Sequence, residues 1–240
     1  LSTMVSGPAG LVTSLVTSLQ SSARTLNLWG LSAIHASRAT WAGTLVLALL
    51  WTGAAHAGQP IVVLGDSLSA AYGMKVEDGW VALLARRLLA QGYDQPVINA
   101  SVSGETTSGG KARIARILRI HAPGVVVIEL GANDALRGLP IAQLEANLTA
   151  IVTTAQASKA RVLLVGAPLP RNYGDTYAHD VADAYRRVSH KTGVPLVASL
   201  LAGISTEERN FQADHLHPAP LVEPQILETI WPSLRPLLAP

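Results

Sequence analysis

Cysteine is absent from the 240 residues of this chain. Its absence excludes disulfide bonds, thiolate metal sites, a cysteine nucleophile and a lipid anchor attached through cysteine. Charged residues are also scarce, at 14% of the chain, whereas 49% of the residues are hydrophobic. The chain can therefore bury a sizeable core, and its composition argues against disorder in the body of the protein.

Acidic residues are missing from residues 1–57, which carry only two basic side chains, Arg24 and Arg38. The remaining residues hold equal numbers of basic and acidic side chains, 16 of each, so they are formally neutral. The basic isoelectric point of about 9.1 is thus largely a property of the leader. Because no basic patch follows the leader, no nucleic-acid partner is expected.

The chain also lacks an uninterrupted apolar run of the ~18–20 residues that a membrane span requires. Residues 38–57 instead have the layout of a secretory signal peptide. A basic residue is followed by the apolar core Ala42–Trp51 and by Ala55-His56-Ala57, which fits A-x-A cleavage. An uncleaved N-terminal anchor is the alternative interpretation.

This pattern predicts two parts of different character. Residues 1–57 form a leader that takes no part in the fold, and residues 58–240 form a single domain. Cleavage near Ala57 would release the domain into the periplasm or the medium.

Short β-branched runs recur from Gln59 onward, and longer segments with a helical period separate them. The expected strands are residues 61–65, 96–100, 125–130, 161–166 and 194–197. Helical apolar stripes occur in residues 80–88, 114–121 and 181–188, and again around 226–238. Near-continuous apolar strands indicate burial on both faces, so we predict an α/β fold with a parallel, doubly wound sheet.

Ligands bind at the carboxyl ends of the strands in such folds, so the residues that follow each strand matter most. Ser67 follows the first strand in "VLGDS". It has two interpretations of equal weight: an N-cap, or a nucleophile at a helix N-terminus where backbone N–H groups stabilise an oxyanion. The chain has no G-x-S-x-G elbow, so the α/β-hydrolase fold is not supported.

Asp214 and His217 in "DHLHP" can supply what a serine nucleophile needs. A spacing of three residues on a turn lets the Asp214 carboxylate accept a hydrogen bond from one imidazole nitrogen of His217, while the other nitrogen faces the serine. Taken alone, the pair is better explained as an ordinary polar surface loop. A metal site on His215-x-His217 is a further alternative, but no further cluster of carboxylates and histidines supports it, and no metal is expected.

Two further residues follow strands and can present hydrogen-bond donors. Asn133 in "GAND" can donate its amide to an oxyanion, or can be a loop residue that tolerates unusual dihedral angles, while its neighbour Asp134 caps the following turn. Gly104 lets the backbone approach a ligand, or is an ordinary turn glycine. The segment "GETTSGGK" is not a phosphate loop, because that motif requires other residues at Glu105 and Ala112.

Together, "VLGDSLSAAYGM", "VIELGANDALRG", "APLPRNYG" and "DHLHP" resemble the SGNH (GDSL) hydrolase family, in its bacterial thioesterase/lysophospholipase/arylesterase branch. The resemblance extends from Gln59 to the C-terminus. It implies a flavodoxin-like three-layer α/β/α sandwich with a five-stranded parallel sheet. It also implies Ser67 as the nucleophile, His217 as general base and acid, and Asp214 as the partner that orients it. The implied oxyanion hole consists of the Ser67 and Gly104 N–H groups and the Asn133 amide.

The expected function is that of an exported serine hydrolase, which cleaves carboxylic esters and thioesters through an acyl-enzyme and needs no cofactor. The expected partner is a small-molecule or lipid ester, with at most transient membrane contact, and the protein is expected to be a monomer. A polysaccharide O-deacetylase with the same triad and a non-catalytic binding domain are the alternatives.

Overall fold

The computed structural model describes residues 58–166 and 169–238. Its centre is a parallel sheet of five strands in the order β2-β1-β3-β4-β5, which is the flavodoxin-like order. All five predicted strands are present, each within about two residues of its expected bounds: β1 (Ile61–Gly65), β2 (Val97–Asn99), β3 (Val125–Glu129), β4 (Arg161–Val165) and β5 (Leu196–Val197). The predicted fold class is therefore confirmed.

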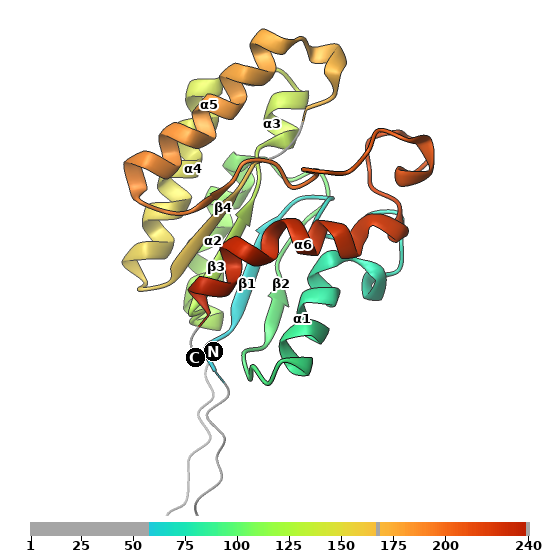
Figure 1. Cartoon of the computed structure of the whole chain (residues 1–240). Helices are drawn as coiled ribbons and strands as arrows, with labels where there is room; N and C mark the ends of the chain where they lie inside the picture. Colours follow the sequence, from blue (N-terminus) through green and yellow to red (C-terminus); the bar gives the residue numbers. More distant parts are fainter. Residues whose placement is uncertain (1–57, 167–168, 239–240) are drawn as a thin grey trace, which may run out of the picture. The chain divides into compact units, whose positions relative to one another are not determined.

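Helices cover both faces of the sheet, as Figure 1 shows. One layer contains α2 (Thr107–His121), α4 (Ile141–Ala157) and α5 (Asp175–Thr192), and the other contains α1 (Trp80–Ala90) and α6 (Glu223–Leu234). A short helix, α3 (Ala132–Leu136), follows β3. Single 3₁₀ turns complete the elements: η1 (Val76–Asp78), η2 (Arg171–Tyr173), η3 (Glu208–Asn210), η4 (Pro220–Val222) and η5 (Arg235–Leu237).

The strands send alternate side chains into two separate cores. Val62 and Leu64 of β1 pack under α2, α4 and α5, whereas Ile61 and Val63 pack under α1 and α6. All four side chains are completely buried. This two-sided burial explains why the strands are near-continuous apolar runs without polar alternation.

The apolar stripes above predicted neither α3 nor the longer helix α4. The buried positions of α4 nevertheless follow the i, i+3, i+4 spacing of one helical face: Leu144, Asn147, Leu148, Ile151, Val152 and Ala155. The polar Asn147 interrupts this face, and it is buried because its amide donates to Thr107 Oγ1 of α2.

The predicted leader, its cleavage site and its signal core lie outside the described residues. In the part of the chain that the structure does describe, none of the helices combines the length and the apolar character needed to cross a bilayer.

Candidate active site

Ser67 lies just beyond the carboxyl end of β1, in a series of turns that runs to Gly73. Here the structure corrects the N-cap interpretation. Asp66 makes the capping contact, since its Oδ1 accepts the Leu68 N–H at 3.0 Å and its carbonyl accepts the Ala70 N–H at 2.9 Å. The first α-helix begins only at Trp80. The Ser67 hydroxyl is therefore free of any capping contact and engages His217 instead.

His217 reaches Ser67 from the loop that precedes α6. Its Nε2 lies 2.8 Å from Ser67 Oγ, and its Nδ1 lies 2.6 Å from Asp214 Oδ2. Asp214 Oδ1 also accepts the backbone N–H groups of Leu216 and His217, each at 3.0 Å, which fixes the carboxylate in the turn. With Nδ1 donating to this carboxylate, Nε2 is left to accept the serine O–H. Such a chain of contacts can move a proton off a hydroxyl.

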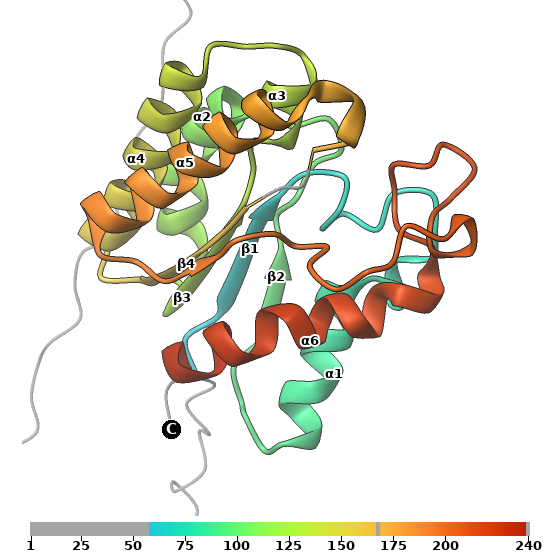
Figure 2. The same ribbon diagram turned by 45° about the horizontal axis from the view of Figure 1, so that its top comes forward.

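The loop that carries His217 is fastened to the loop that carries Ser67. The Gln212 side chain donates to the carbonyl of Tyr72 at 2.7 Å, and the Tyr72 ring lies 4.5 Å from the His217 ring, centroid to centroid. Figure 2 shows the two loops side by side. These contacts hold the imidazole against the serine although the two residues are 150 positions apart.

Ser67 and His217 line a cavity of about 170 Å³ together with Gly104 and Asn133. Gly104 has a φ of 77°, a conformation that suits glycine and leaves its backbone exposed at the cavity. Asn133 lies in α3 and donates one amide hydrogen to Asp66 Oδ2 at 3.0 Å, so its second hydrogen remains for another acceptor. All the residues predicted for the triad and for the oxyanion hole therefore meet at one edge of the sheet.

Two buried acids lie behind this cavity. Burial raises the pKa of Asp66 to about 6, although hydrogen bonds from the Leu68 N–H and the Asn133 amide favour its charged form. Burial and the nearby Asp66 charge also raise the pKa of Glu129, which accepts the Ser69 hydroxyl at 2.7 Å. Two neighbouring carboxyls resist ionising together, and this repulsion adds to the effect of burial on Glu129.

Helix α3 is also joined to α2 and to the Gly104 loop. Asp134 accepts both the N–H and the hydroxyl of Thr107, the first residue of α2. Its carboxylate therefore binds the start of α2 and does not cap the turn that follows it in sequence, which corrects the expectation above. Arg137 donates to the Gly104 carbonyl at 2.9 Å. Asn133 and the Gly104 loop consequently keep a fixed spacing across the cavity.

Sequence reasoning missed Glu129, Arg137 and the positioning contact of Asp66. Only Glu129 carried a visible signal, because an acid at the end of the apolar run "VVVIE" must be buried with a partner. The alternative of a metal at His215-x-His217 is not favoured, since both ring nitrogens of His217 are engaged. Across residues 58–166 and 169–238, no three His, Asp or Glu side chains gather in a way that could hold a metal ion.

Comparison with known proteins agrees with this geometry. Residues 63–221 match the model of the GDSL-like lipase/acylhydrolase family. The chain is 46% identical to Esterase TesA of Pseudomonas aeruginosa over 196 residues, which are 82% of this chain and 96% of that protein. It is 34% identical to Thioesterase 1/protease 1/lysophospholipase L1 of Escherichia coli K12 over 198 residues, which are 82% of this chain and 94% of that protein.

A solved structure is similar as well. The psychrotrophic esterase EstA from Pseudoalteromonas sp., inhibited by monoethylphosphonate, superposes with a TM-score of 0.70 at 38% identity, over 74% of this chain and 97% of that one. The family indicated by the four sequence blocks is thus confirmed. This chain belongs to the GDSL-like lipase/acylhydrolase family, the SGNH hydrolases.

Proposed function

We propose that this protein is a serine esterase that hydrolyses carboxylic esters and thioesters through an acyl-enzyme. The observation that carries the proposal is the unbroken chain of contacts from Asp214 through His217 to Ser67, beside a cavity with two further donors. The names of the similar proteins, an esterase and a thioesterase/lysophospholipase, support the same reaction class.

The proposed reaction has two halves. Ser67 Oγ attacks the substrate carbonyl while His217 Nε2 takes the hydroxyl proton, and the carbonyl oxygen becomes an oxyanion. The backbone N–H groups of Ser67 and Gly104 and the free amide hydrogen of Asn133 stabilise that charge. The tetrahedral adduct collapses, and the alcohol or thiol leaves with the proton from His217. Water then attacks the acyl-serine in the same way and releases the acid.

Asp214 keeps its negative charge throughout this cycle. Partial loss of hydration would raise its pKa, but hydrogen bonds from the His217 N–H, the His217 ring and the Leu216 N–H outweigh that effect and lower the pKa to about 2. The carboxylate therefore stabilises the imidazolium that forms when His217 holds the proton.

An apolar hollow next to the cavity supports a substrate with an alkyl chain. The hollow has a volume of about 350 Å³ and shares Leu201 and Leu216 with the cavity. Leu169, Ile204 and Phe211 contribute most of its remaining apolar wall. A volume of this size is typical of small-molecule sites. We therefore expect a p-nitrophenyl octanoate to be cleaved with a higher kcat/KM than the acetate, and faster cleavage of the acetate would contradict a lipid-like substrate.

The test of the nucleophile compares Ser67→Ala with a control in which the exposed Ser108, on α2, is changed to alanine. Ser67→Ala should unfold at the wild-type temperature, lose turnover of p-nitrophenyl esters and acyl-CoA, and fail to react with a fluorophosphonate probe. Ser108→Ala should keep all three properties. Undiminished turnover by Ser67→Ala would refute the proposed mechanism.

We also propose that the protein is exported and acts as a monomer, with at most transient contact with membranes. The signal-peptide layout of residues 38–57 is the support for export. Mass spectrometry of the protein from the producing cell should give an N-terminus at Gly58, and size-exclusion chromatography should give a single protomer. An intact leader on the purified protein would contradict cleavage.

A further inference from the structure

Helix α3, which carries Asn133, is too short to be stable by itself. It has only five residues, from Ala132 to Leu136. A helix of that length forms too few internal hydrogen bonds to offset the free-energy cost of its nucleation. Its C-terminal end is closed by a single turn, in which the Gly138 N–H binds the Ala135 carbonyl at 3.0 Å, and no further helix follows. Contacts from elsewhere in the fold must therefore hold α3 in place.

Two tyrosines supply contacts at the C-terminal end of α3. The Tyr177 hydroxyl donates to the Ala135 carbonyl at 3.0 Å, and the Tyr173 hydroxyl donates to the Leu136 carbonyl at 3.0 Å. Their rings stack at 25° with centroids 6.4 Å apart, and both side chains are half-buried. The Tyr173 hydroxyl thus supplies a partner to the last carbonyl of α3, and the Tyr177 hydroxyl adds a second donor to the Ala135 carbonyl.

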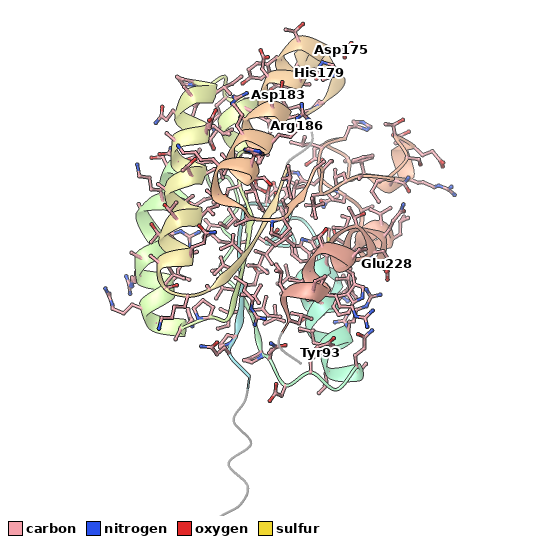
Figure 3. The ribbon with its side chains drawn as sticks, turned by 60° about the vertical axis from the view of Figure 1, so that its left-hand side comes forward. Tyr93, Asp175, His179, Asp183, Arg186 and Glu228 are labelled. Atoms are coloured by element: carbon pink, nitrogen blue, oxygen red, sulfur yellow. The ribbon has the colours of Figure 1, made fainter. Side chains whose placement is uncertain are left out.

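The tyrosines come from the segment at the start of α5 and bind the C-terminal end of α3. Tyr173 is in η2 and Tyr177 is in the first turns of α5. Figure 2 shows the start of α5 running beside α3, and Figure 3 marks Asp175, the first residue of α5, at that end of the domain. Asn133 and Asp134 instead bind Asp66 and Thr107. Different parts of the chain therefore hold the first residues of helix α3 and its last ones.

We propose that Tyr173 and Tyr177 are positioning residues for the reaction, whose hydroxyls hold α3 so that the Asn133 amide stays aimed into the cavity. The inference rests on the proposed role of Asn133 as an oxyanion donor. Neither tyrosine needs to touch the substrate. Burial and the neighbouring Tyr173 and Asp134 raise the pKa of Tyr177, which keeps its hydroxyl protonated and able to donate.

A loosened α3 would affect the transition state more than the bound substrate. Preorganised donors act on the charge that develops on the carbonyl oxygen, and removing one of them typically lowers kcat by about 10²–10³-fold. Loss of the two hydroxyls leaves the Asn133 amide in the cavity but less precisely oriented. The decrease in kcat should therefore be smaller than the decrease caused by removing the amide itself. We expect kcat to fall about tenfold in the double variant, with KM changed by less than about twofold.

The experiment measures kcat and KM for Tyr173→Phe, Tyr177→Phe and the double variant of the full chain on a p-nitrophenyl ester. Phenylalanine keeps the stacked rings and removes only the hydroxyls. Tyr93→Phe is the matched control, because Tyr93 packs against Trp231 and lies at the opposite end of the domain in Figure 3. The control should keep the wild-type kcat.

A double-mutant cycle separates positioning from a general structural effect. The Phe substitutions are repeated in an Asn133→Ala background, where no amide is left to aim, so they should lower kcat no further. An equal loss in both backgrounds, or no loss in the wild-type background, would overturn the inference. Failure of the proposed function would look different: the wild type itself would not hydrolyse the ester, or Asn133→Ala would retain full kcat.

Discussion

Glu223→Gln should make the protein more stable at alkaline pH while leaving it nearly unchanged at acidic pH. Glu223 is the first residue of α6, and only 1% of its surface is exposed. Its Oε2 accepts the N–H of Trp80, the first residue of α1, at 2.7 Å. Its Oε1 is also buried, and within the described residues it has no hydrogen-bond partner. A charged carboxylate in this position is poorly solvated.

The size of the effect follows from the pKa. Burial raises the pKa of Glu223 from its ordinary 4.5 to about 7, although the hydrogen bond from Trp80 opposes this. Between these two values the folded state holds a proton that the unfolded state has released. The free energy of unfolding therefore falls with rising pH by about 1.4 kcal/mol per unit, and the contribution of this proton is lost as pH passes 7. The total loss is on the order of 3 kcal/mol by pH 8.

Glutamine keeps an oxygen that accepts the Trp80 N–H and carries no charge at any pH. Urea unfolding of the wild type and of Glu223→Gln should therefore give similar free energies at pH 5, and should favour the variant by up to about 3 kcal/mol at pH 8. Glu228→Gln, an exposed change on the same helix, is the control and should follow the wild type within about 1 kcal/mol. Parallel curves for the wild type and Glu223→Gln from pH 5 to 8 would refute the reasoning.

Three further changes have definite expected outcomes. Asp214→Asn should lower kcat on a p-nitrophenyl ester by about 10²–10⁴-fold with little effect on KM, because the amide removes the charge that stabilises the imidazolium; a loss below about threefold would exclude that role. Leu148→Ala, at a completely buried position of α4, should lower the free energy of unfolding by about 2–5 kcal/mol in urea titration, and a change under about 1 kcal/mol would mean that the core refills the space. Gly166→Ala should also destabilise the protein, by roughly 1–3 kcal/mol, since the new Cβ would lie 2.3 Å from the backbone oxygen of Ala198; a wild-type unfolding midpoint would show that the strand end can shift.

Features that depend on the local pattern of apolar and polar residues could be predicted from the sequence. The five strands could be predicted from apolar runs, and Ser67 and His217 could be paired because strand order brings their loops to one sheet edge. Features that depend on long-range contact could not be found in this way. Nothing in "GAND" reveals that Asp134 binds the first residue of a helix 27 positions earlier. Likewise, the spacing of Tyr173 and Tyr177 does not indicate that their hydroxyls bind carbonyl groups at the end of a different helix.

The 150 positions between Ser67 and His217 have a consequence for the order in which this protein matures. A chain folded as far as Val197 already has all five strands, the hydroxyl and both cavity donors. It has no imidazole beside the hydroxyl, and it also lacks Leu201 and Leu216, which line both the cavity and the neighbouring hollow. Catalysis begins only when the last segment docks and α6 packs on α1. Enzymatic activity regained after dilution from denaturant therefore requires this last segment to dock, whereas circular dichroism reports only the recovered helix and strand content.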